Sequence, residues 1–239
     1  MIPRQTIGTA TTPDGGEIKL VRDATGFVIT TDDMVLMATR KHGSEEAMAE
    51  VSCPPLGALS RPRVLVGGLG LGYTLRATLD LLPPTAAVHC VELIDAIVAW
   101  HHGPLGPVAN HPIDDPRVTM EIGDVTERIK QTGPEEAFDA ILLDVDNGPV
   151  PMTVVGNWWL YAAAGLAGLY RALAPGGRLV VWSVGDDDLF VGRMWKAGFA
   201  TEVVPVAARS GQRLGGRCRH RHVLFVGQRP ARTPRQRRS

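Results

Sequence analysis

The sequence feature that most constrains the fold of this chain is a glycine-rich turn between an apolar strand and a helix. Residues 64–66 have the short, β-branched character of a buried parallel strand, and residues 73–82 are expected to form the following helix. Between them, residues 67–72 read Gly-Gly-Leu-Gly-Leu-Gly. Glycines let a ligand approach the backbone, and the free N–H groups of a helix start favour a nucleotide or an amino-acid tail. A ligand site is therefore expected outside the carboxyl ends of the strands.

The spacing of the glycines narrows the kind of ligand. Gly68, Gly70 and Gly72 give G-x-G-x-G, which differs from the G-x-G-x-x-G of dinucleotide folds. The turn also lacks the Gly-Lys-Ser/Thr ending of a P-loop. Taken alone, the turn would also fit a close-packed corner without a ligand, so the assignment of a ligand site depends on the rest of the chain.

From residue 63 onward, predicted strands and helices alternate. Six further strands are expected at residues 86–92, 118–122, 138–144, 178–183, 201–207 and 222–227, with helices at 94–101, 125–131, 157–173 and 187–197. This alternation predicts an α/β fold with a doubly wound, mostly parallel seven-stranded sheet. The last two strands are joined without a helix and are expected to form an antiparallel edge.

A smaller β unit is expected ahead of the main domain. Candidate strands at residues 17–22, 27–30 and 34–39 are separated by turn residues, and a helix is expected at residues 44–53. We therefore expect an N-terminal β unit at residues 1–42 and a main domain at residues 43–229. A basic, disordered tail is expected at residues 230–239.

Composition excludes several classes of protein. The 239 residues are 44% hydrophobic and 21% charged, a globular balance, and no apolar run approaches the ~20 residues of a membrane span. Three distant cysteines (Cys53, Cys90 and Cys218) predict a cytoplasmic location and neither a disulfide framework nor a zinc site. No acidic residue follows Glu202. The arginine-rich end is interpreted first as a basic surface loop with a disordered tail and second as a contact with nucleic acid.

Three acids follow three successive predicted strands. Glu92 can accept hydrogen bonds from both hydroxyls of a ribose, as in dinucleotide folds. Asp124 can accept a hydrogen bond from an adenine amino group, although a helix N-cap is an alternative role. Asp144 lies beside the glycine turn, where it would face the reacting end of a bound cofactor. Together these acids favour a nucleoside site at this edge of the sheet.

Five motifs in order resemble a known family. VLVGGLGLG, HCVELID, MEIGDV, FDAILLDVDNGP and LAPGGRLVVW are similar to the class I S-adenosylmethionine-dependent methyltransferase fold. The short β unit, and DVDNGP where an Asp-rich DSSDP-type loop is usual, resemble its spermidine-synthase-like branch more closely. The resemblance covers residues 25–228. It implies a Rossmann-like methyltransferase fold with S-adenosylmethionine, or its decarboxylated form, as cofactor.

The resemblance also implies roles for individual residues. The glycines would hold the methionine-derived tail, Glu92 the ribose and Asp124 the adenine, and Asp144 would match the acid that helps to deprotonate the attacking amine in aminopropyltransferases. From the chemistry of the acids themselves, Asp144 or Asp146 could take a proton from an amine or attract a cationic acceptor. For Asp146, a turn into Gly148 and Pro149 is an equal alternative. The cofactor-binding residues expected in full are Gly68, Gly70, Gly72, Glu92, Leu93, Gly123, Asp124, Val125 and Asp144.

Two departures from the branch decide the expected reaction. Leu71 stands where spermidine synthases have an aspartate that binds the amine of decarboxylated S-adenosylmethionine, and the tyrosine and histidine pattern of the preceding helix is absent. Leucine cannot pair with an ammonium group. We therefore expect methyl transfer to a small-molecule acceptor, an amine or another nucleophile. Aminopropyl transfer is the first alternative, and a non-catalytic nucleoside-binding protein the second.

Other candidates carry weaker signals. Trp158 and Trp159 are candidates to cover an acceptor, and Asp187 and its neighbours to cap a helix or attract a basic acceptor. His42 and Glu46 flank the expected acceptor side. The histidines at positions 101, 102 and 111 lack metal-ligand spacing, so no metal is expected. No membrane association is expected, and the resemblance implies a homodimer.

Overall fold

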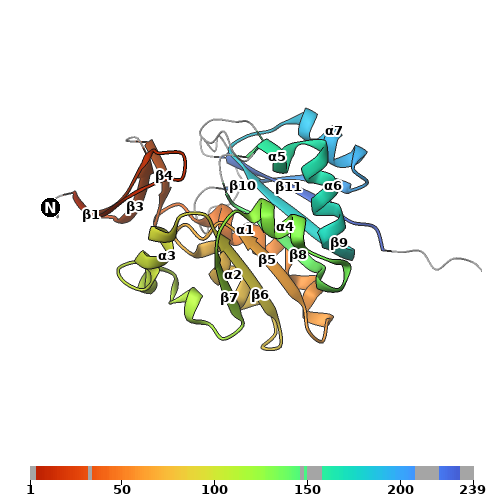
Figure 1. Ribbon diagram of the computed structural model, residues 1–239, viewed down its shortest axis with the longest axis horizontal. Helices are drawn as coiled ribbons and strands as arrows, with labels where there is room; N and C mark the ends of the chain where they lie inside the picture. The colour runs from red at the N-terminus through yellow and green to blue at the C-terminus, as the bar shows by residue number, and fades with distance from the viewer. Residues whose placement is uncertain (1–3, 32–33, 146–147, 150–157, 208–220, 232–239) are drawn as a thin grey trace, which may run out of the picture.

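Two β-sheets organise the chain. The computed structural model describes residues 4–31, 34–145, 148–149, 158–207 and 221–231. A four-stranded sheet has the order β1-β2-β3-β4, and a seven-stranded sheet has the order β10-β11-β9-β8-β5-β6-β7. The small sheet lies at one end of the molecule and the large sheet, with its helices, forms the body (Figure 1). The α/β class and the N-terminal β unit are therefore confirmed.

The small sheet is antiparallel throughout and has one strand more than predicted. Its strands are β1 (Gln5–Thr11), β2 (Glu17–Asp23), β3 (Gly26–Thr31) and β4 (Met34–Ala38). The unpredicted strand is β1, whose sequence QTIGTAT has little apolar alternation and which is largely exposed at the edge of the sheet. It is held by backbone pairing with β2, from Gln5 opposite Arg22 to Thr11 opposite Glu17.

The large sheet has the predicted number and direction of strands. They are β5 (Arg63–Gly67), β6 (Ala87–Glu92), β7 (Val118–Ile122), β8 (Phe138–Leu143), β9 (Leu173–Ser183), β10 (Ala200–Ala207) and β11 (Arg221–Gln228). Strands β7, β6, β5, β8 and β9 are parallel neighbours. Strand β11 is antiparallel to β9, and β10 to β11, so the expected antiparallel edge is confirmed.

Seven α-helices and four short 3₁₀ segments connect the strands in the described residues. The helices are α1 (Gly43–Ser52), α2 (Tyr73–Leu81), α3 (Asp95–His101), α4 (Val125–Gln131), α5 (Trp158–Tyr161), α6 (Ala163–Ala172) and α7 (Asp188–Lys196). The 3₁₀ segments are η1 (Pro54–Ala58), η2 (Gly106–Ala109), η3 (Pro112–Asp114) and η4 (Pro134–Glu136). Within the described chain, no helix has the length and hydropathy needed to cross a membrane.

The prediction of one long helix at residues 157–173 was wrong. Helices α5 and α6 are separated at Ala162, whose backbone is extended, with φ −80° and ψ 165°. The chain turns there so closely that a Cβ at Gly165 would collide with the carbonyl oxygen of Trp159. Strand β9 also begins at Leu173, ahead of the predicted start at residue 178. The first residue of the predicted helix, at position 157, lies outside the described residues.

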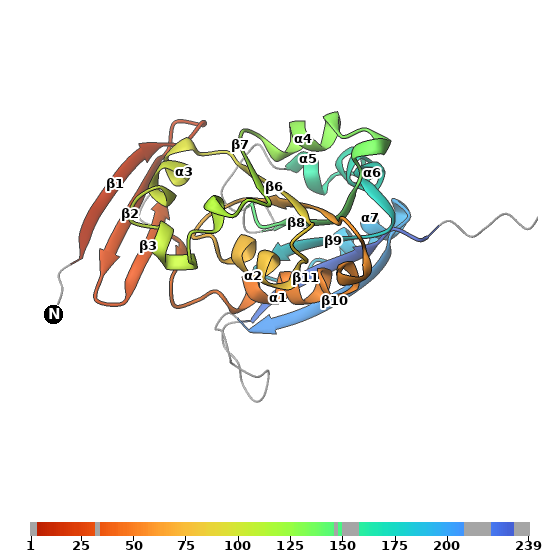
Figure 2. The ribbon, with the colours of Figure 1, turned by 90° about the horizontal axis from the view of Figure 1, so that it is seen from below.

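Alternate residues of the strands build a core on each face of the large sheet. Val64 and Val66 of β5 belong to a cluster with side chains of α1, α2 and α3, whereas Leu65 belongs to a cluster with those of α4, α5, α6 and α7. Figure 2 shows α1 and α2 on one side of the strands and α4, α6 and α7 on the other. Burial on both faces explains why residues 64–66 of β5 are continuously apolar.

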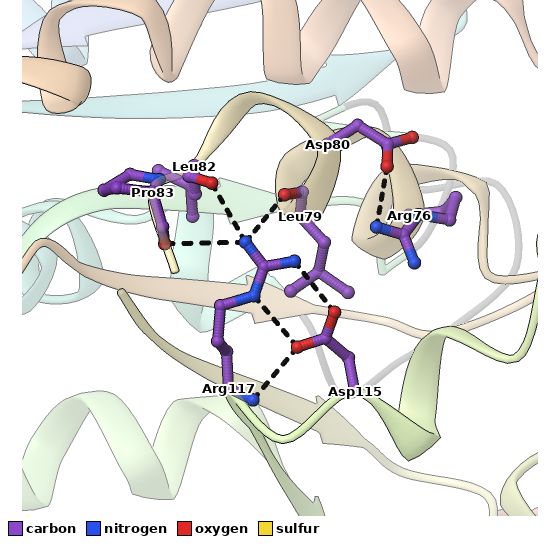
Figure 3. Close-up of polar contacts among 7 residues, drawn as sticks. All are labelled: Arg76, Leu79, Asp80, Leu82, Pro83, Asp115 and Arg117. Atoms are coloured by element: carbon purple, nitrogen blue, oxygen red, sulfur yellow. Dashed lines mark hydrogen bonds and ion pairs between the residues drawn. The ribbon is translucent and has the colours of Figure 1, made fainter. Parts of the chain in front are cut away.

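A half-buried ion pair fixes the amino edge of the large sheet. The Arg117 guanidinium donates to both carboxylate oxygens of Asp115, over 2.9 and 2.8 Å, and also to the carbonyls of Leu79 and Leu82, each over 2.9 Å (Figure 3). Those carbonyls lie at the C-terminal end of α2, where no helical N–H is left to pair with them. Arg117 therefore joins α2 to the start of β7.

The strand order places a crevice at the opposite edge. Strand β5 lies between β6 and β8, so the chain leaves β5 toward one side and returns on the other. Open α/β sheets bind ligands at such a switch point, outside the carboxyl ends of the strands. The glycine turn follows β5 and Asp144 follows β8, so both lie at this point.

Candidate active site

The glycine turn is closed against the end of β8. The Asp144 N–H donates to the Gly67 carbonyl over 2.9 Å, and the Gly68 N–H donates to the Val91 carbonyl over the same distance. Gly68 has φ +87°, and a Cβ at this position would collide with the backbone carbonyl oxygen of Asp144. Glycine is required there because the two loops meet at backbone distance.

The small sheet covers the same turn. Gly70 has φ +49°, and a Cβ there would collide with the sulfur of Met37, next to the end of β4. On its other side, His101 of α3 lies 3.0 Å through Nε2 from the Gly70 carbonyl oxygen. Gly72 instead faces His101, Pro112 and Ala109 and does not line the cavity described below, and its expected contact with a cofactor stays a prediction.

Glu92 is bound by the backbone of the turn. Its carboxylate accepts hydrogen bonds from the N–H groups of Leu69 over 2.8 Å, Gly70 over 3.5 Å and Ile94 over 2.9 Å. Burial raises the pKa of this carboxyl, and the three N–H groups oppose that rise. The N–H groups of Leu69 and Gly70 therefore already bind a carboxylate of the protein. From the sequence, N–H groups of this turn were expected to bind the tail of a ligand.

A cavity of about 640 Å³ lies between the small sheet and the carboxyl edge of the large sheet. Its volume is in the range of small-molecule sites. The predicted cofactor-binding residues that line it are Gly68, Gly70, Glu92, Leu93, Gly123, Asp124, Val125 and Asp144. The structure thus brings together eight of the nine residues predicted to bind a cofactor, and their binding roles stay predictions. Asp146 lies outside the described residues.

Asp124 and Asp144 face this cavity from the ends of β7 and β8. Asp124 caps α4, because its carboxylate accepts a hydrogen bond from the Thr126 N–H over 2.7 Å. The N-cap role that the sequence offered as an alternative is therefore present, and Asp124 also lines the cavity. Asp144 accepts a hydrogen bond over 2.9 Å from the Thr74 hydroxyl, in the first turn of α2. That bond orients one oxygen of the Asp144 carboxylate.

Sequence reasoning missed part of the cavity wall. Glu45 of α1, Trp182 of β9 and His222 of β11 line it, as does Met37. Burial and the nearby Asp144 charge raise the pKa of Glu45 to about 8. Glu45 looked like an ordinary acid in the first turn of a helix. The signal that could have singled it out is its place where the spermidine-synthase-like branch has its tyrosine and histidine pattern.

The weaker candidates lie outside the cavity lining. His42 Nδ1 is 3.0 Å from the Glu46 carboxylate, and its ring stacks on Tyr73. Asp187 accepts a hydrogen bond from the Phe190 N–H over 2.8 Å, so it caps α7 as the simpler interpretation stated. Trp158 is exposed on α5. Among the described residues, no three acids, histidines or cysteines gather as metal ligands.

Comparison with known proteins identifies the fold. No family model matches the chain. A spermine synthase of Arabidopsis thaliana is 31% identical over 170 residues, which are 70% of this chain and 44% of that protein. The chain therefore spans less than half the length of this curated relative.

Two solved structures have the same fold as this chain. A spermidine synthase in complex with the transition-state analogue AdoDATO has a TM-score of 0.71 and 17% identity over 95% of this chain and 73% of that one. The spermidine synthase of Thermotoga maritima has a TM-score of 0.69 and 16% identity, over the same shares of the two chains.

These relatives overturn the expectation of methyl transfer. They are named as spermine and spermidine synthases, not as methyltransferases. The physical basis of that expectation fails as well. Leu71 is 1% exposed, belongs to the core cluster of α1 and α2, and does not line the cavity. Its identity therefore does not report which charge the cofactor's tail carries, and the chain shares its fold with the spermidine synthases.

Proposed function

We propose that this protein is an aminopropyltransferase of the spermidine-synthase-like branch. It would transfer the aminopropyl group of decarboxylated S-adenosylmethionine to the amine of a small acceptor. The observation that carries the proposal is Asp144, held by Thr74 at the end of β8 and facing a cavity at the switch point. The similarity to spermine and spermidine synthases supports the same reaction.

The nucleoside half of the cavity suits an adenosyl group. Glu92 lies where a ribose is expected in this class of fold, and Leu93, Asp124 and Val125 lie where the adenine is expected. A tail that ends in a carboxylate would lie close to Glu92, whose carboxylate already occupies the N–H groups of Leu69 and Gly70. Like charges in a buried site repel, so a tail ending in an ammonium group is favoured.

The acceptor half of the cavity combines apolar walls with acids. Ile18 and Ile29 of the small sheet line it, together with Val35 of β4. Such a surface suits a chain of methylene groups, and Asp144 supplies the negative charge that a buried ammonium group needs. A diamine or polyamine has both features, and we propose it as the acceptor class.

Asp144 would orient the attacking amine. In the reaction, the amine nitrogen forms a bond to the propyl carbon next to the sulfonium, the carbon–sulfur bond breaks, and sulfur keeps its electron pair. The products are the aminopropylated amine and methylthioadenosine. The step requires an in-line approach and an amine that has lost its proton. A hydrogen bond to the Asp144 carboxylate would align the amine and balance its charge.

The test is the identity of the product. The purified protein is incubated with decarboxylated S-adenosylmethionine and diamines of increasing length, beginning with putrescine, and the products are measured by mass spectrometry. We expect methylthioadenosine and the aminopropylated amine in equal amounts, and no S-adenosylhomocysteine when S-adenosylmethionine is supplied. Binding of the nucleoside without turnover of any amine would reject the proposal in favour of a non-catalytic nucleoside-binding protein.

A homodimer and a cytoplasmic location complete the proposal. Cys53 and Cys90 are free thiols, both buried, which suits a reducing compartment. The basic segment at residues 209–220 and the end of the chain from residue 232 lie outside the described residues. A contact with nucleic acid thus stays a prediction. Light scattering of the eluting protein tests the dimer.

A further inference from the structure

Three polar side chains meet where α1 reaches the cavity. The Ser44 hydroxyl donates to Glu45 Oε2 over 2.6 Å. The Ser44 hydroxyl oxygen also lies 2.9 Å from Nδ1 of His222, on β11. Ser44 is fully buried and Glu45 is 7% exposed. The ring of His222 packs edge-on against Trp182, with the ring centroids 4.6 Å apart. Elements from both ends of the chain therefore hold this group in place.

The direction of the hydrogen bonds follows from the chemistry of the groups. A serine hydroxyl has one proton to donate and lone pairs to accept. When Glu45 is ionised, its carboxylate can only accept, so the Ser44 proton goes to Glu45. In that state the contact with His222 is made by an Nδ1–H that donates to the Ser44 oxygen. Ser44 has no exposed surface, so it cannot attack a substrate. Its role is to orient the carboxylate of Glu45.

Glu45 and Asp144 bring two acids to one cavity. Both line it, and burial together with the negative charge of Asp144 raises the pKa of Glu45. Glu46 on the same helix adds a weaker effect in the same direction. Burial, together with the charges of the two glutamates, raises the pKa of Tyr73 on α2. Lys41 also lines the cavity. An ammonium group that enters between the two acids would replace their repulsion by attraction.

We propose that Glu45 accepts the proton that the acceptor ammonium must lose, and that Ser44 and His222 position its carboxylate for that transfer. This inference rests on the proposed function. The ammonium gives one proton to Glu45 and becomes a neutral amine, whose lone pair forms the new bond to carbon. The carbon–sulfur bond breaks, its electrons pass to sulfur, and the positive charge moves to the product ammonium. Glu45 then releases its proton to water.

Glu45 suits this task better than an ordinary carboxyl. A base works best when its pKa lies near the working pH. The pKa of Glu45, raised to about 8, approaches the basicity of an amine, which makes the transfer less uphill. Asp144, oriented by Thr74, keeps its separate role of aligning the amine.

The experiment measures kcat and KM between pH 6 and 10 with two amines of different basicity. For the wild-type protein, kcat should rise with pH around 8 for both amines, because the group that titrates belongs to the enzyme. Glu45→Gln should lower kcat about 100-fold and remove that rise. Glu45→Asp should restore part of the rate. Methylthioadenosine should bind all variants equally, which shows that they are folded.

Two further variants separate chemistry from structure. Ser44→Ala keeps Glu45 but removes a hydrogen bond that lowers its pKa, so the rise in kcat should move to higher pH. Glu50→Gln is the matched control, because Glu50 is exposed on the same helix and does not line the cavity, so this variant should leave kcat within about twofold. A purely structural role of Ser44 would change stability without moving the pH profile.

The outcomes distinguish this inference from the proposed function. No turnover of any amine by the wild-type protein rejects both. Turnover with a Glu45→Gln variant that keeps its rate, or that loses rate with an unmoved pH profile, rejects the role of Glu45 alone. Loss of the pH-dependent rise in Glu45→Gln, with its shift in Ser44→Ala, supports it.

Discussion

Two carboxyl groups at opposite edges of the large sheet have opposite electrostatic surroundings. At the amino edge, hydrogen bonds from Arg117 lower the pKa of Asp115 to about 2 (Figure 3). At the carboxyl edge, burial and the charge of Asp144 raise the pKa of Glu45 to about 8. An acid that is paired with a guanidinium contributes to stability as an ion. An acid that is buried beside another acid costs stability when it ionises, and is therefore available to bind a cation or a proton.

The largest expected effect comes from one change made at each edge. Asp144→Asn should lower kcat about 10³-fold, about 4 kcal/mol of barrier, because it removes the charge that we propose aligns the amine. Asp115→Asn should leave kcat per folded molecule unchanged and lower the melting temperature, because Arg117 loses its ionic partner. Steady-state kinetics and thermal unfolding of both variants test this. Equal effects of the two changes on kcat would contradict the proposed difference between Asp144 at the carboxyl edge and Asp115 at the amino edge.

The sequence predicted the carboxyl edge of the large sheet well, for a simple physical reason. Parallel strands end at the same edge, so acids that follow successive strands meet there, as Glu92, Asp124 and Asp144 do. The side chains of Val64, Leu65 and Val66 in β5 point to two faces and are all apolar, which identified a buried central strand. By contrast, β1 went unpredicted because its pairing depends on backbone groups and not on an apolar pattern.

Residues that depend on distant parts of the chain could not be predicted. Ser44 and His222 are 178 positions apart, and only the antiparallel return of β11 brings them within hydrogen-bond distance. The misinterpretation of Leu71 has a related cause. A motif gives the position of a residue in a turn, but the direction of its side chain is set by the packing of α1 and α2, which buries Leu71 in the core.

The second prediction breaks the pair at the amino edge. Arg117→Ala should reduce the free energy of unfolding by about 3 kcal/mol, because it leaves the Asp115 carboxylate and the carbonyls at the end of α2 without their donor. For a domain of this size that corresponds to roughly 10 °C in melting temperature. Urea denaturation followed by circular dichroism measures the loss. A loss below about 1 kcal/mol would mean that water replaces the guanidinium at little cost.

The third prediction sharpens the contrast through pH. The pKa of Glu45 is higher in the folded chain than its ordinary value of 4.5, so its contribution to stability is fully present below about pH 4.5 and is lost as pH rises through 8. Glu45→Gln removes this dependence. The variant should therefore melt several °C above the wild-type protein at pH 9, about 2 kcal/mol, and close to it at pH 5. Thermal unfolding at both pH values tests this. Equal melting at pH 9 would show that Glu45 ionises without cost.

The smallest effect is expected from the other arginine beside α2. Arg76 and Asp80 form an i,i+4 ion pair over 2.6 Å on the helix, with side chains 20% and 63% exposed, against 15% for both Arg117 and Asp115 (Figure 3). A pair open to water contributes about 0.3–0.5 kcal/mol, because water solvates both ions when the pair opens. Arg76→Ala should therefore change the free energy of unfolding by less than about 0.5 kcal/mol in the same urea titration. An equal loss of unfolding free energy in Arg76→Ala and Arg117→Ala would show that exposure and hydrogen bonding to the helix end do not explain the strength of the two pairs. A small loss of unfolding free energy in Arg76→Ala with a large loss in Arg117→Ala would mean that Arg117 stabilises the fold through the carbonyls that it binds as well as through its charge.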